Sequence, residues 1–431
     1  MTRRRSSSTS GPSGGQRVTI GTVTGLVVIG IVLIAQYVLG INILSTDPTA
    51  TPLRATVRPT VAWTPIPTAA WTPIPSPDGT PVASIPGGEA QPIPGGIDGG
   101  WYQLYFTAPI NTRDESRFTG SPVEAALVRA IDNATSTIDL AVYQLNSRPV
   151  TDALLRAHAK GVQVRIVTDD EYGLEHPDST IEELEFEGIP VRSDAPRRAF
   201  MHNKFFIIDG LYVWTGSTNI TNNDLYNNNN NAILIRSRQL AENYQAEFDE
   251  MWAGQFGARS ANNVRSPVLT VNGTVIETFF ESEGSPAWGG YQSEPIVRLI
   301  ALARQARSVR FMAFVLTRDD LMTAMAEQAG AGALDVRGVV ESSQRRYITT
   351  LFCAGLDVRQ DGNPDILHHK VFIFDDTTVA LGSFNFTSSA ANDNDENMLI
   401  IHNRDVARAF LEEFERRWAE ATPLPAESYT C

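Results

Sequence analysis

Two short stretches of the chain carry the same polar residues at the same spacing. MHNKFFIIDGLYVWTGSTN covers residues 201–219, and LHHKVFIFDDTTVALGSFN covers residues 367–385. Nine of the 18 positions from the histidine to the last asparagine are identical, and no insertion separates the two copies. Six residue types at fixed spacing arise by chance in roughly one chain in a hundred thousand, so a second copy excludes coincidence. The shared polar residues are His202 and His368, Lys204 and Lys370, Asp209 and Asp375, Ser217 and Ser383, and Asn219 and Asn385.

The chemistry that these residue types favour is phosphoryl transfer. A histidine and a lysine two residues apart on a strand point to the same side of the sheet, where each disfavours the charge of the other. A bound phosphate removes that conflict, because its oxygens accept hydrogen bonds from lysine while the imidazole faces phosphorus. With a pKa of about 6.5, one histidine can attack phosphorus while a second protonates the leaving alcohol. The Gly-Ser-x-Asn turns would add neutral donors around the same oxygens.

The elements around the two stretches repeat in the same order. Strand-like and helix-like segments alternate before each histidine, and each copy closes with a strand and a long amphipathic helix. These closing pairs are AILIRS with QLAENYQAEFDEMW, and MLII with RDVARAFLEEFERRW. The sequence therefore predicts an internal duplication, residues 101–260 and 266–421, in which each half is an α/β layer structure.

The two stretches resemble the signature of the phospholipase D superfamily, H-x-K-x4-D-x6-G-S-x-N, and match it without a departure. The resemblance covers residues 101–421. It implies two α/β/α repeats packed about a pseudo-twofold axis, both motifs in one cleft, and metal-independent cleavage of a phosphodiester through a covalent phosphohistidine. It implies catalytic roles for His202, Lys204, Asn219, His368, Lys370 and Asn385, and supporting roles for Asp209, Ser217, Asp375 and Ser383.

The same resemblance predicts a difference between the halves. In this superfamily an acidic residue after the motif commonly orients the histidine, and the position 13 residues beyond the motif serine is Glu396 in the second half but Asn230 in the first. We expect Glu396 to raise the pKa of His368, while Asn230 gives His202 no comparable lift unless Asp224 replaces it. His202 is then the nucleophile and His368 the acid. No carboxylate cluster lies beside the motifs, so we expect no metal and no other cofactor.

The first hundred residues predict a membrane anchor and a tether. Residues 1–17 are basic, and residues 18–44 are apolar over more than the roughly 20 residues that span a bilayer. The positive-inside rule places residues 1–17 in the cytoplasm and the rest outside; a cleaved signal peptide is the alternative. Residues 45–100 hold 12 of the 25 prolines and predict a disordered Pro/Thr/Gly-rich linker. Residues 422–431 are predicted to be a C-terminal tail.

Charge and cysteine content bear on the surroundings of the protein. Residues 101–431 carry 29 Lys and Arg against 45 Asp and Glu, which disfavours a general nucleic-acid binder. Cys353 lies in an apolar stretch typical of buried free thiols, so we expect it not to pair with Cys431. Asn219 and Asn385 each begin a glycosylation sequon, and a glycan there would block the cleft. A bacterial cell surface fits such a chain better than a eukaryotic secretory route.

Together these features predict a membrane-anchored phosphodiesterase of phospholipase D type. Its expected substrate is a phospholipid headgroup ester. Three alternatives stay open: a metal-independent nuclease acting on single-stranded nucleic acid, a synthase that transfers a phosphatidyl group, and an inactive binding scaffold. No obligate protein partner is evident in the sequence.

Overall fold

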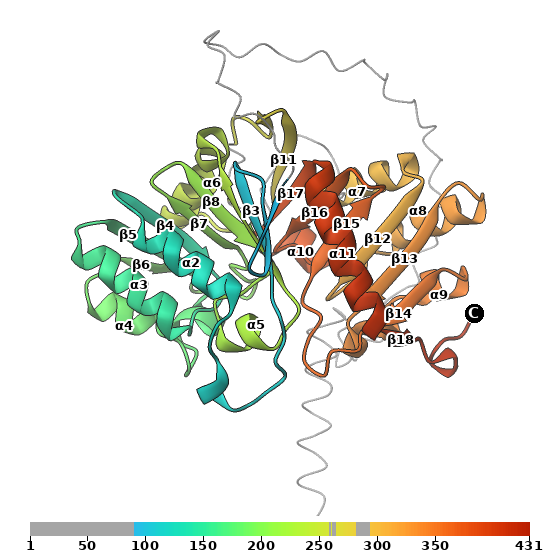
Figure 1. The fold of residues 1–431 in the computed structure, drawn as a ribbon, viewed down its shortest axis with the longest axis horizontal. Helices are drawn as coiled ribbons and strands as arrows, with labels where there is room; N and C mark the ends of the chain where they lie inside the picture. Colours follow the sequence, from blue (N-terminus) through green and yellow to red (C-terminus); the bar gives the residue numbers. More distant parts are fainter. Residues whose placement is uncertain (1–89, 258–259, 261–263, 282–293) are drawn as a thin grey trace, which may run out of the picture. The chain divides into compact units, whose positions relative to one another are not determined.

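The computed structural model describes residues 90–257, 260, 264–281 and 294–431. Within these residues the chain forms two α/β repeats, each built on a nine-stranded sheet (Figure 1). The strand order is β1-β2-β3-β9-β8-β7-β4-β5-β6 in the first sheet and β10-β11-β17-β16-β15-β12-β13-β14-β18 in the second. The predicted α/β class and the duplication are confirmed.

The first repeat contains these strands: β1 (Gln91–Ile93), β2 (Gly96–Asp98), β3 (Tyr102–Phe106), β4 (Thr137–Val142), β5 (Gln163–Thr168), β6 (Val191–Ser193), β7 (Lys204–Ile208), β8 (Tyr212–Gly216) and β9 (Asn231–Arg236). Its helices are α2 (Pro122–Asp132), α3 (Arg148–Ala159), α4 (Ile181–Phe186), α5 (Asn222–Tyr226) and α6 (Arg238–Trp252), with the short turns η1 (Glu115–Arg117) and η2 (Asp170–Leu174).

The second repeat contains these strands: β10 (Val268–Val271), β11 (Thr274–Glu281), β12 (Ser308–Ala313), β13 (Asp335–Val340), β14 (Asp357–Gln360), β15 (Lys370–Phe374), β16 (Thr378–Gly382), β17 (Glu396–His402) and β18 (Thr422–Pro423). Its helices are α7 (Glu294–Gln305), α8 (Asp319–Gly330), α9 (Thr349–Cys353), α10 (Ser388–Asn392) and α11 (Arg404–Glu420), with the short turns η5 (Ser342–Tyr347) and η6 (Ala426–Ser428).

The topology places the motif histidine and lysine of each repeat at one edge of its sheet. Strands β4, β5 and β6 are parallel, and β7 is antiparallel to β4 with Lys204 opposite Val142. The second repeat repeats this arrangement, with Lys370 on β15 opposite Ala313 on β12. The residues that follow β4 and β5 therefore meet the start of β7 at the same edge, and the same holds for β12, β13 and β15.

The two repeats share one core that also contains the long helices α6 and α11 (Figure 1). Apolar residues recur every three or four positions on each helix: Leu240, Tyr244, Phe248 and Met251 on α6, and Val406, Phe410, Phe414 and Trp418 on α11. Burying one such side chain contributes about 1.5–3 kcal/mol. Two further cores lie under the other helices of each repeat. The shared core joins the repeats before any polar contact is considered.

The predicted C-terminal boundary of the linker, residue 100, was wrong. Residues 91–98 form the hairpin β1–β2, which pairs with β3 and extends the first sheet. Pro94 and Gly95 make its two-residue loop, in which Gly95 adopts a φ of +74° that strongly favours glycine. Residues 45–89 of the linker, the basic tail and the predicted anchor at 18–44 lie outside the described residues. No helix in the described part of the chain is long and apolar enough to cross a membrane.

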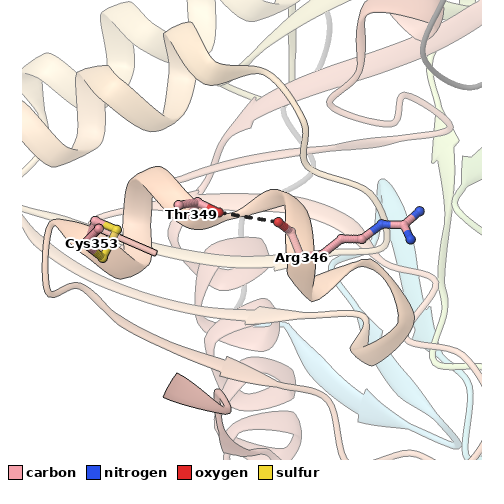
Figure 2. The surroundings of a disulfide bond; sticks show 4 residues. Arg346, Thr349 and Cys353 are labelled. Atoms are coloured by element: carbon pink, nitrogen blue, oxygen red, sulfur yellow. Dashed lines mark hydrogen bonds between the residues drawn. A yellow bond between two sulfur atoms is a disulfide. The ribbon is translucent and has the colours of Figure 1, made fainter. Parts of the chain in front are cut away.

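The C-terminal residues pack against the second repeat. Strand β18 pairs with β14, the Tyr429 ring stacks on Phe352 at 4.2 Å, and the Tyr429 hydroxyl donates to the Arg345 carbonyl at 2.7 Å. This path brings Cys431 to the end of α9, where it forms a disulfide with Cys353 (Figure 2). The expectation of unpaired cysteines was wrong, because Cys353 is exposed at the end of a helix and not buried.

Loss of this disulfide should destabilise the folded protein. It closes a loop with a sequence separation of 78, so Cys431→Ser should lower the free energy of unfolding by about 2–4 kcal/mol. Denaturant unfolding of the variant and of the reduced wild-type protein should give the same decrease. Two thiols that alkylate in the unreduced native protein, measured by mass spectrometry, would contradict the disulfide.

Candidate active site

The two repeats pair reciprocally at their histidines. The segment that precedes each motif histidine forms a short parallel bridge with the segment that begins the closing strand of the other repeat. Each bridge consists of two backbone hydrogen bonds, so each histidine is positioned by the opposite half of the chain. The bonds are His202 N–H to Asp395 O (3.0 Å), Asp395 N–H to Phe200 O (2.9 Å), His368 N–H to Asn229 O (2.9 Å) and Asn229 N–H to Ile366 O (2.8 Å).

The acceptor for the His202 ring comes from the second repeat. Glu396, fully buried at the start of β17, lies 2.8 Å from His202 Nδ1 through Oε2. Ser383 Oγ donates to the same oxygen at 2.6 Å, and Asn394 Nδ2 donates to Oε1 at 3.3 Å. The prediction that Glu396 orients His368 was wrong, because the reciprocal bridge brings β17 beside the histidine of the other repeat.

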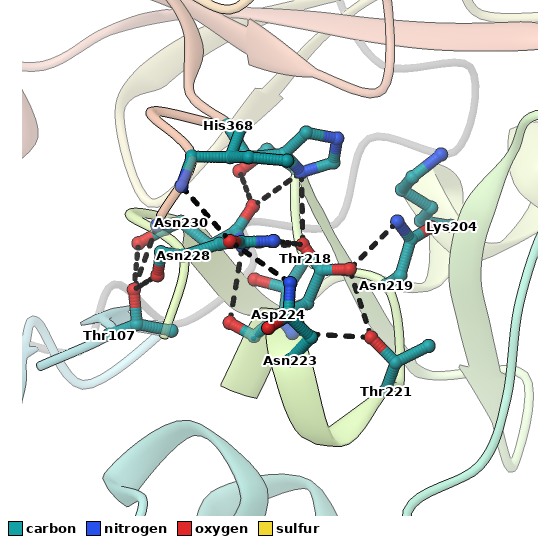
Figure 3. A network of polar contacts seen from close by, with 12 residues as sticks. Thr107, Lys204, Thr218, Asn219, Thr221, Asn223, Asp224, Asn228, Asn230 and His368 are labelled. Atoms are coloured by element: carbon teal, nitrogen blue, oxygen red, sulfur yellow. Dashed lines mark hydrogen bonds and ion pairs between the residues drawn. The ribbon is translucent and has the colours of Figure 1, made fainter. Parts of the chain in front are cut away.

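The acceptors for the His368 ring come from the first repeat (Figure 3). His368 Nδ1 lies 2.9 Å from Asn230 Oδ1 and 3.2 Å from Asp224 Oδ1. Ser217 Oγ also donates to Asn230 Oδ1, and Asn230 Nδ2 donates to Asp224 Oδ1 at 2.8 Å. Asp224 therefore provides the carboxylate that Asn230 lacks. The histidine that it contacts is His368 of the second repeat, not His202 of its own repeat. In both rings Nδ1 faces the acceptor, so Nε2 lies on the side of the ring away from it.

The two lysines are buried beside the histidines. Lys204 is 2% exposed and Lys370 is 1% exposed, and each donates from Nζ to the carbonyl of its own motif histidine, at 2.7 and 3.0 Å. Burial lowers the pKa of Lys204 to about 8. Burial and then the charge of Lys204 lower the pKa of Lys370. Two ammonium groups that repel one another in a buried site favour the binding of an anion beside them.

Burial also lowers the pKa of both histidines. Burial, and then Lys204 and Lys370, hold the pKa of His202 well below its ordinary value. Burial and Lys370 lower the pKa of His368 to about 4, although Asp224 acts in the opposite direction. Both rings are therefore neutral near pH 7 as long as the lysine charges are not compensated by an anion.

The two carboxylate partners differ in charge. Burial raises the pKa of Glu396 to about 7, against the lowering effect of Lys204. Burial also acts to raise the pKa of Asp224, but His368 and the amide donors bring it below its ordinary value. Asp224 thus stays ionised beside His368 at neutral pH, while Glu396 is near its midpoint.

The motif asparagines are not equivalent. Asn219 Nδ2 donates to Asp224 Oδ2 at 3.0 Å, so one of its two N–H groups is already used within the protein (Figure 3). Asn385 makes no side-chain hydrogen bond with the described residues, and its amide can donate to a ligand. Gly216 and Gly382 precede the motif serines, where an added Cβ would lie 2.3 and 2.2 Å from a carbonyl of the adjacent strand. Only glycine permits that approach.

The motif aspartates lie at the other end of the strand from the histidines. Asp209 follows β7 with φ +54° and accepts from the backbone N–H groups of residues 135–137. Asp375 has φ +53° and accepts from the N–H groups of Arg307 and Ser308. They fix the start of β4 and β12. His369 lies on the opposite side of its strand, between Asn231 at 2.9 Å and Glu413 at 3.2 Å, as the strand alternation predicts.

One group of carboxylates in the described part of the chain has the spacing of metal ligands. Asp169, Asp170 and Asp194 place one oxygen each within 4.8 Å of one another. Asp169 Oδ1 accepts from Tyr172 N–H at 2.8 Å, and Asp194 accepts from the N–H groups of Asp170 and Met201 at 2.9 and 3.1 Å. These bonds give two of the three side chains a role in fixing the backbone. Sequence spacing could not identify this group, because its members follow different strands.

Comparison with known proteins agrees with this geometry. The family model described as "Cardiolipin synthase, PLD-like domain" matches residues 127–252 and 296–418, more than half of the chain. The mitochondrial cardiolipin hydrolase of Chlamydomonas reinhardtii is 34% identical over 143 residues, 32% of this chain and 62% of that protein. The human protein of the same name is 32% identical over 133 residues, 31% of this chain and 52% of that protein. The chain thus spans between half and two thirds of the length of these relatives.

A solved structure supports the fold alone. The phosphatidylserine synthase of Haemophilus influenzae Rd KW20 aligns with a TM-score of 0.55 and 16% identity, over 70% of this chain and 86% of that chain.

Crossed pairing of the histidines can be tested without turnover. Glu396→Gln should shift the ¹⁵N resonance of His202 Nδ1 and leave that of His368 unchanged, while Asp224→Asn should do the reverse. Because the pKa of Glu396 is about 7, the His202 Nδ1 signal should titrate near pH 7 in the wild type but not in Glu396→Gln. Histidine-selective NMR measures both effects. A shift of the His368 resonance in Glu396→Gln would contradict the crossed pairing and show that Glu396 contacts the histidine of its own repeat.

Proposed function

Because the chain belongs to the family of cardiolipin synthase and phospholipase D-like domains, we propose that it is a phosphodiesterase that hydrolyses phospholipid headgroup esters. The observation that carries this proposal is a pair of buried lysines, each donating to the carbonyl of its own motif histidine, together with two histidines whose Nδ1 atoms each lie beside an acceptor of the other repeat. Such a site fits a phosphate oxygen between the lysines and phosphorus between the two Nε2 atoms. The name of the relatives, cardiolipin hydrolase, supports a phospholipid as the substrate.

In the first step His202 acts as the nucleophile. Its neutral Nε2 attacks phosphorus, and the bond from phosphorus to the headgroup oxygen breaks while that oxygen takes a proton from His368 Nε2. Lys204, Lys370 and the Asn385 amide stabilise the charge on the non-bridging oxygens. In the second step water gives a proton to His368 Nε2 and attacks phosphorus, the phosphorus–nitrogen bond breaks, and His202 is restored.

The assignment of the two histidines rests on their carboxylates. Asp224 is ionised at neutral pH and favours a positive charge on His368, whereas the partner of His202 is Glu396, whose pKa is raised to about 7 by burial. A bound phosphodiester compensates the charge of Lys204 and Lys370, which removes one cause of the low pKa of His368. His368 therefore gains its proton together with the substrate. His202 thus stays the proposed nucleophile and His368 the proposed acid. The reason is now the contact of His368 with Asp224, and no longer a contact with Glu396.

The nuclease alternative is less well supported than lipid cleavage. The acidic balance of residues 101–431 disfavours a polyanion, and the names of the relatives refer to a lipid. Transfer of the phosphatidyl group to an alcohol uses the same intermediate, with the alcohol in place of water, so it remains a second candidate.

Membrane attachment is part of the proposal. We place residues 18–44 in the cytoplasmic membrane and the two repeats on its outer side, and the bacterial origin stays a prediction. The Cys353–Cys431 disulfide supports an oxidising compartment for the second repeat. Mass spectrometry of these two cysteines in protein taken from intact cells therefore also tests the compartment.

The substrate class can be tested directly. The full-length protein should release free headgroup from phospholipid vesicles and leave single-stranded DNA intact, and excess chelator should not change the rate. Lys204→Ala and Lys370→Ala should each lower the rate by about 10²-fold or more, because each removes a charge from the phosphate oxygens. Nicking of DNA without headgroup release would favour the nuclease. Loss of activity on chelation, restored by a divalent cation, would exclude the mechanism.

The covalent intermediate distinguishes the two histidines. Rapid quenching with phosphorus-labelled lipid should place the label on His202. His368→Ala should still form that adduct from a substrate with a good leaving group and then accumulate it, while His202→Ala should form none. Peptide mapping of the labelled protein measures both, and a label on His368 would reverse the roles.

A further inference from the structure

Three aromatic rings form a continuous surface beside His202. The Tyr143 ring lies edge-on to the His202 ring at 4.8 Å and stacks on Tyr172 at 5.4 Å. Phe200 contacts both tyrosines, at 5.6 and 5.4 Å. All three residues are partly exposed. We call Tyr143, Tyr172 and Phe200 the aromatic wall; the proposed chemistry does not use it.

The backbone around the aromatic wall is fixed by buried groups. Tyr172 lies on η2, a single π-helical turn, a form frequent at functional sites. An added Cβ on Gly173 would lie 1.9 Å from Thr168 Oγ1 and 2.9 Å from the Tyr143 carbonyl, so only glycine lets η2 approach Tyr143. Asp169 accepts from the Tyr172 N–H at 2.8 Å.

The third ring is held in the same way. Asp194 accepts from the N–H of Met201 at 3.1 Å, directly after Phe200, and from the N–H of Asp170 at 2.9 Å, at the start of η2. One buried carboxylate thus connects the segments that carry Phe200 and Tyr172. The rings are placed by the fold and are not incidental surface residues.

The second repeat has no equivalent surface in its described part. Phe314 occupies the place of Tyr143, at 5.0 Å from the His368 ring, and it is the one described aromatic residue that packs against that histidine. Ile366 stands two residues before His368, where Phe200 stands before His202. The backbone supports are partly kept, since Glu341 accepts from the N–H groups of Ser343 and Leu367. The lysines, histidines and turns are duplicated, but the aromatic wall is not.

The His202 side of the cleft therefore has an aromatic surface that the His368 side lacks. In an in-line displacement the leaving group departs opposite the nucleophile, so a headgroup that leaves towards His368 lies away from the aromatic wall. The group that stays on phosphorus is the part of the substrate nearest to His202. Three partly exposed rings offer that group a flat apolar surface, and an apolar chain that covers them gains roughly 25 cal/mol for each Å² removed from water.

We propose that the aromatic wall binds the diacylglyceryl half of the phospholipid, the half that remains on phosphorus when the headgroup leaves. This inference rests on the proposed function and on His202 as the nucleophile. It explains why the wall is present in one repeat only: the two halves of the substrate differ, one apolar and one polar. It also makes Tyr172 and Phe200 selective for acylated substrates and not for the phosphodiester itself.

The test compares two substrates with the same phosphodiester. Vesicles of long-chain phosphatidylglycerol carry the acyl chains, and glycerophosphoglycerol lacks them. In the full-length protein Tyr172→Ala and Phe200→Ala should each lower kcat/KM on vesicles about tenfold and leave that on glycerophosphoglycerol within about twofold. Tyr172→Phe, which keeps the ring, should behave as the wild type. Phe186→Ala is the matched control, because Phe186, at the end of α4, is 87% exposed and is not one of the three residues of the wall.

Each other outcome has a defined meaning. Equal losses on both substrates would show that the wall only shapes the cleft, and unchanged rates on both would show that it does not touch the substrate; either overturns the inference. If the wild-type protein cleaves neither phosphatidylglycerol nor glycerophosphoglycerol, the proposed function itself is refuted, and this inference with it. If that protein instead cleaves single-stranded DNA and the alanine variants do not, the wall is a surface for stacking bases.

Discussion

The site depends on the two parallel bridges between the repeats. Each bridge fixes the backbone of one histidine against a strand of the other half, at His202 with Asp395 and at His368 with Asn229. The side chains that follow in those strands then become the partners of the histidine rings. Neither repeat contains a complete site, so the pairing of the two repeats also positions the histidines and sets the surroundings of their rings.

The bridges also determine the electrostatics. They bring Lys204 and Lys370 into the same buried volume, where the charge of each lowers the pKa of neighbouring groups. An anion between them relieves this repulsion, which makes phosphate binding and protonation of His368 favour one another. The cost of burying two lysines is thus connected to function: the folded protein has to hold a charge arrangement that only its ligand completes.

The sequence predicted the motif residues and not their partners. His202, Lys204 and their counterparts follow from strand alternation, and the α/β duplication from repeated order, because both are local properties. The acceptor of each ring depends on the register between repeats, so Glu396 and Asp224 were matched with the wrong histidine or left open. The Cys353–Cys431 disulfide and the pairing of the β1–β2 hairpin with β3 depend on contacts between segments, which no local pattern encodes. The aromatic wall gathers residues from three separate segments.

The crossed pairing has a consequence for how the two halves could diverge. Two identical copies of one repeat, paired by the same bridges, would give both histidines the same acceptor. Here one histidine has Glu396 and the other has Asn230 with Asp224, while Ala390 occupies the second-half position equivalent to Asp224. A change in one repeat therefore alters the proton affinity of the histidine in the other. A fixed assignment of nucleophile and acid requires two halves that differ in sequence, and a single covalent chain keeps the unlike halves together in every molecule.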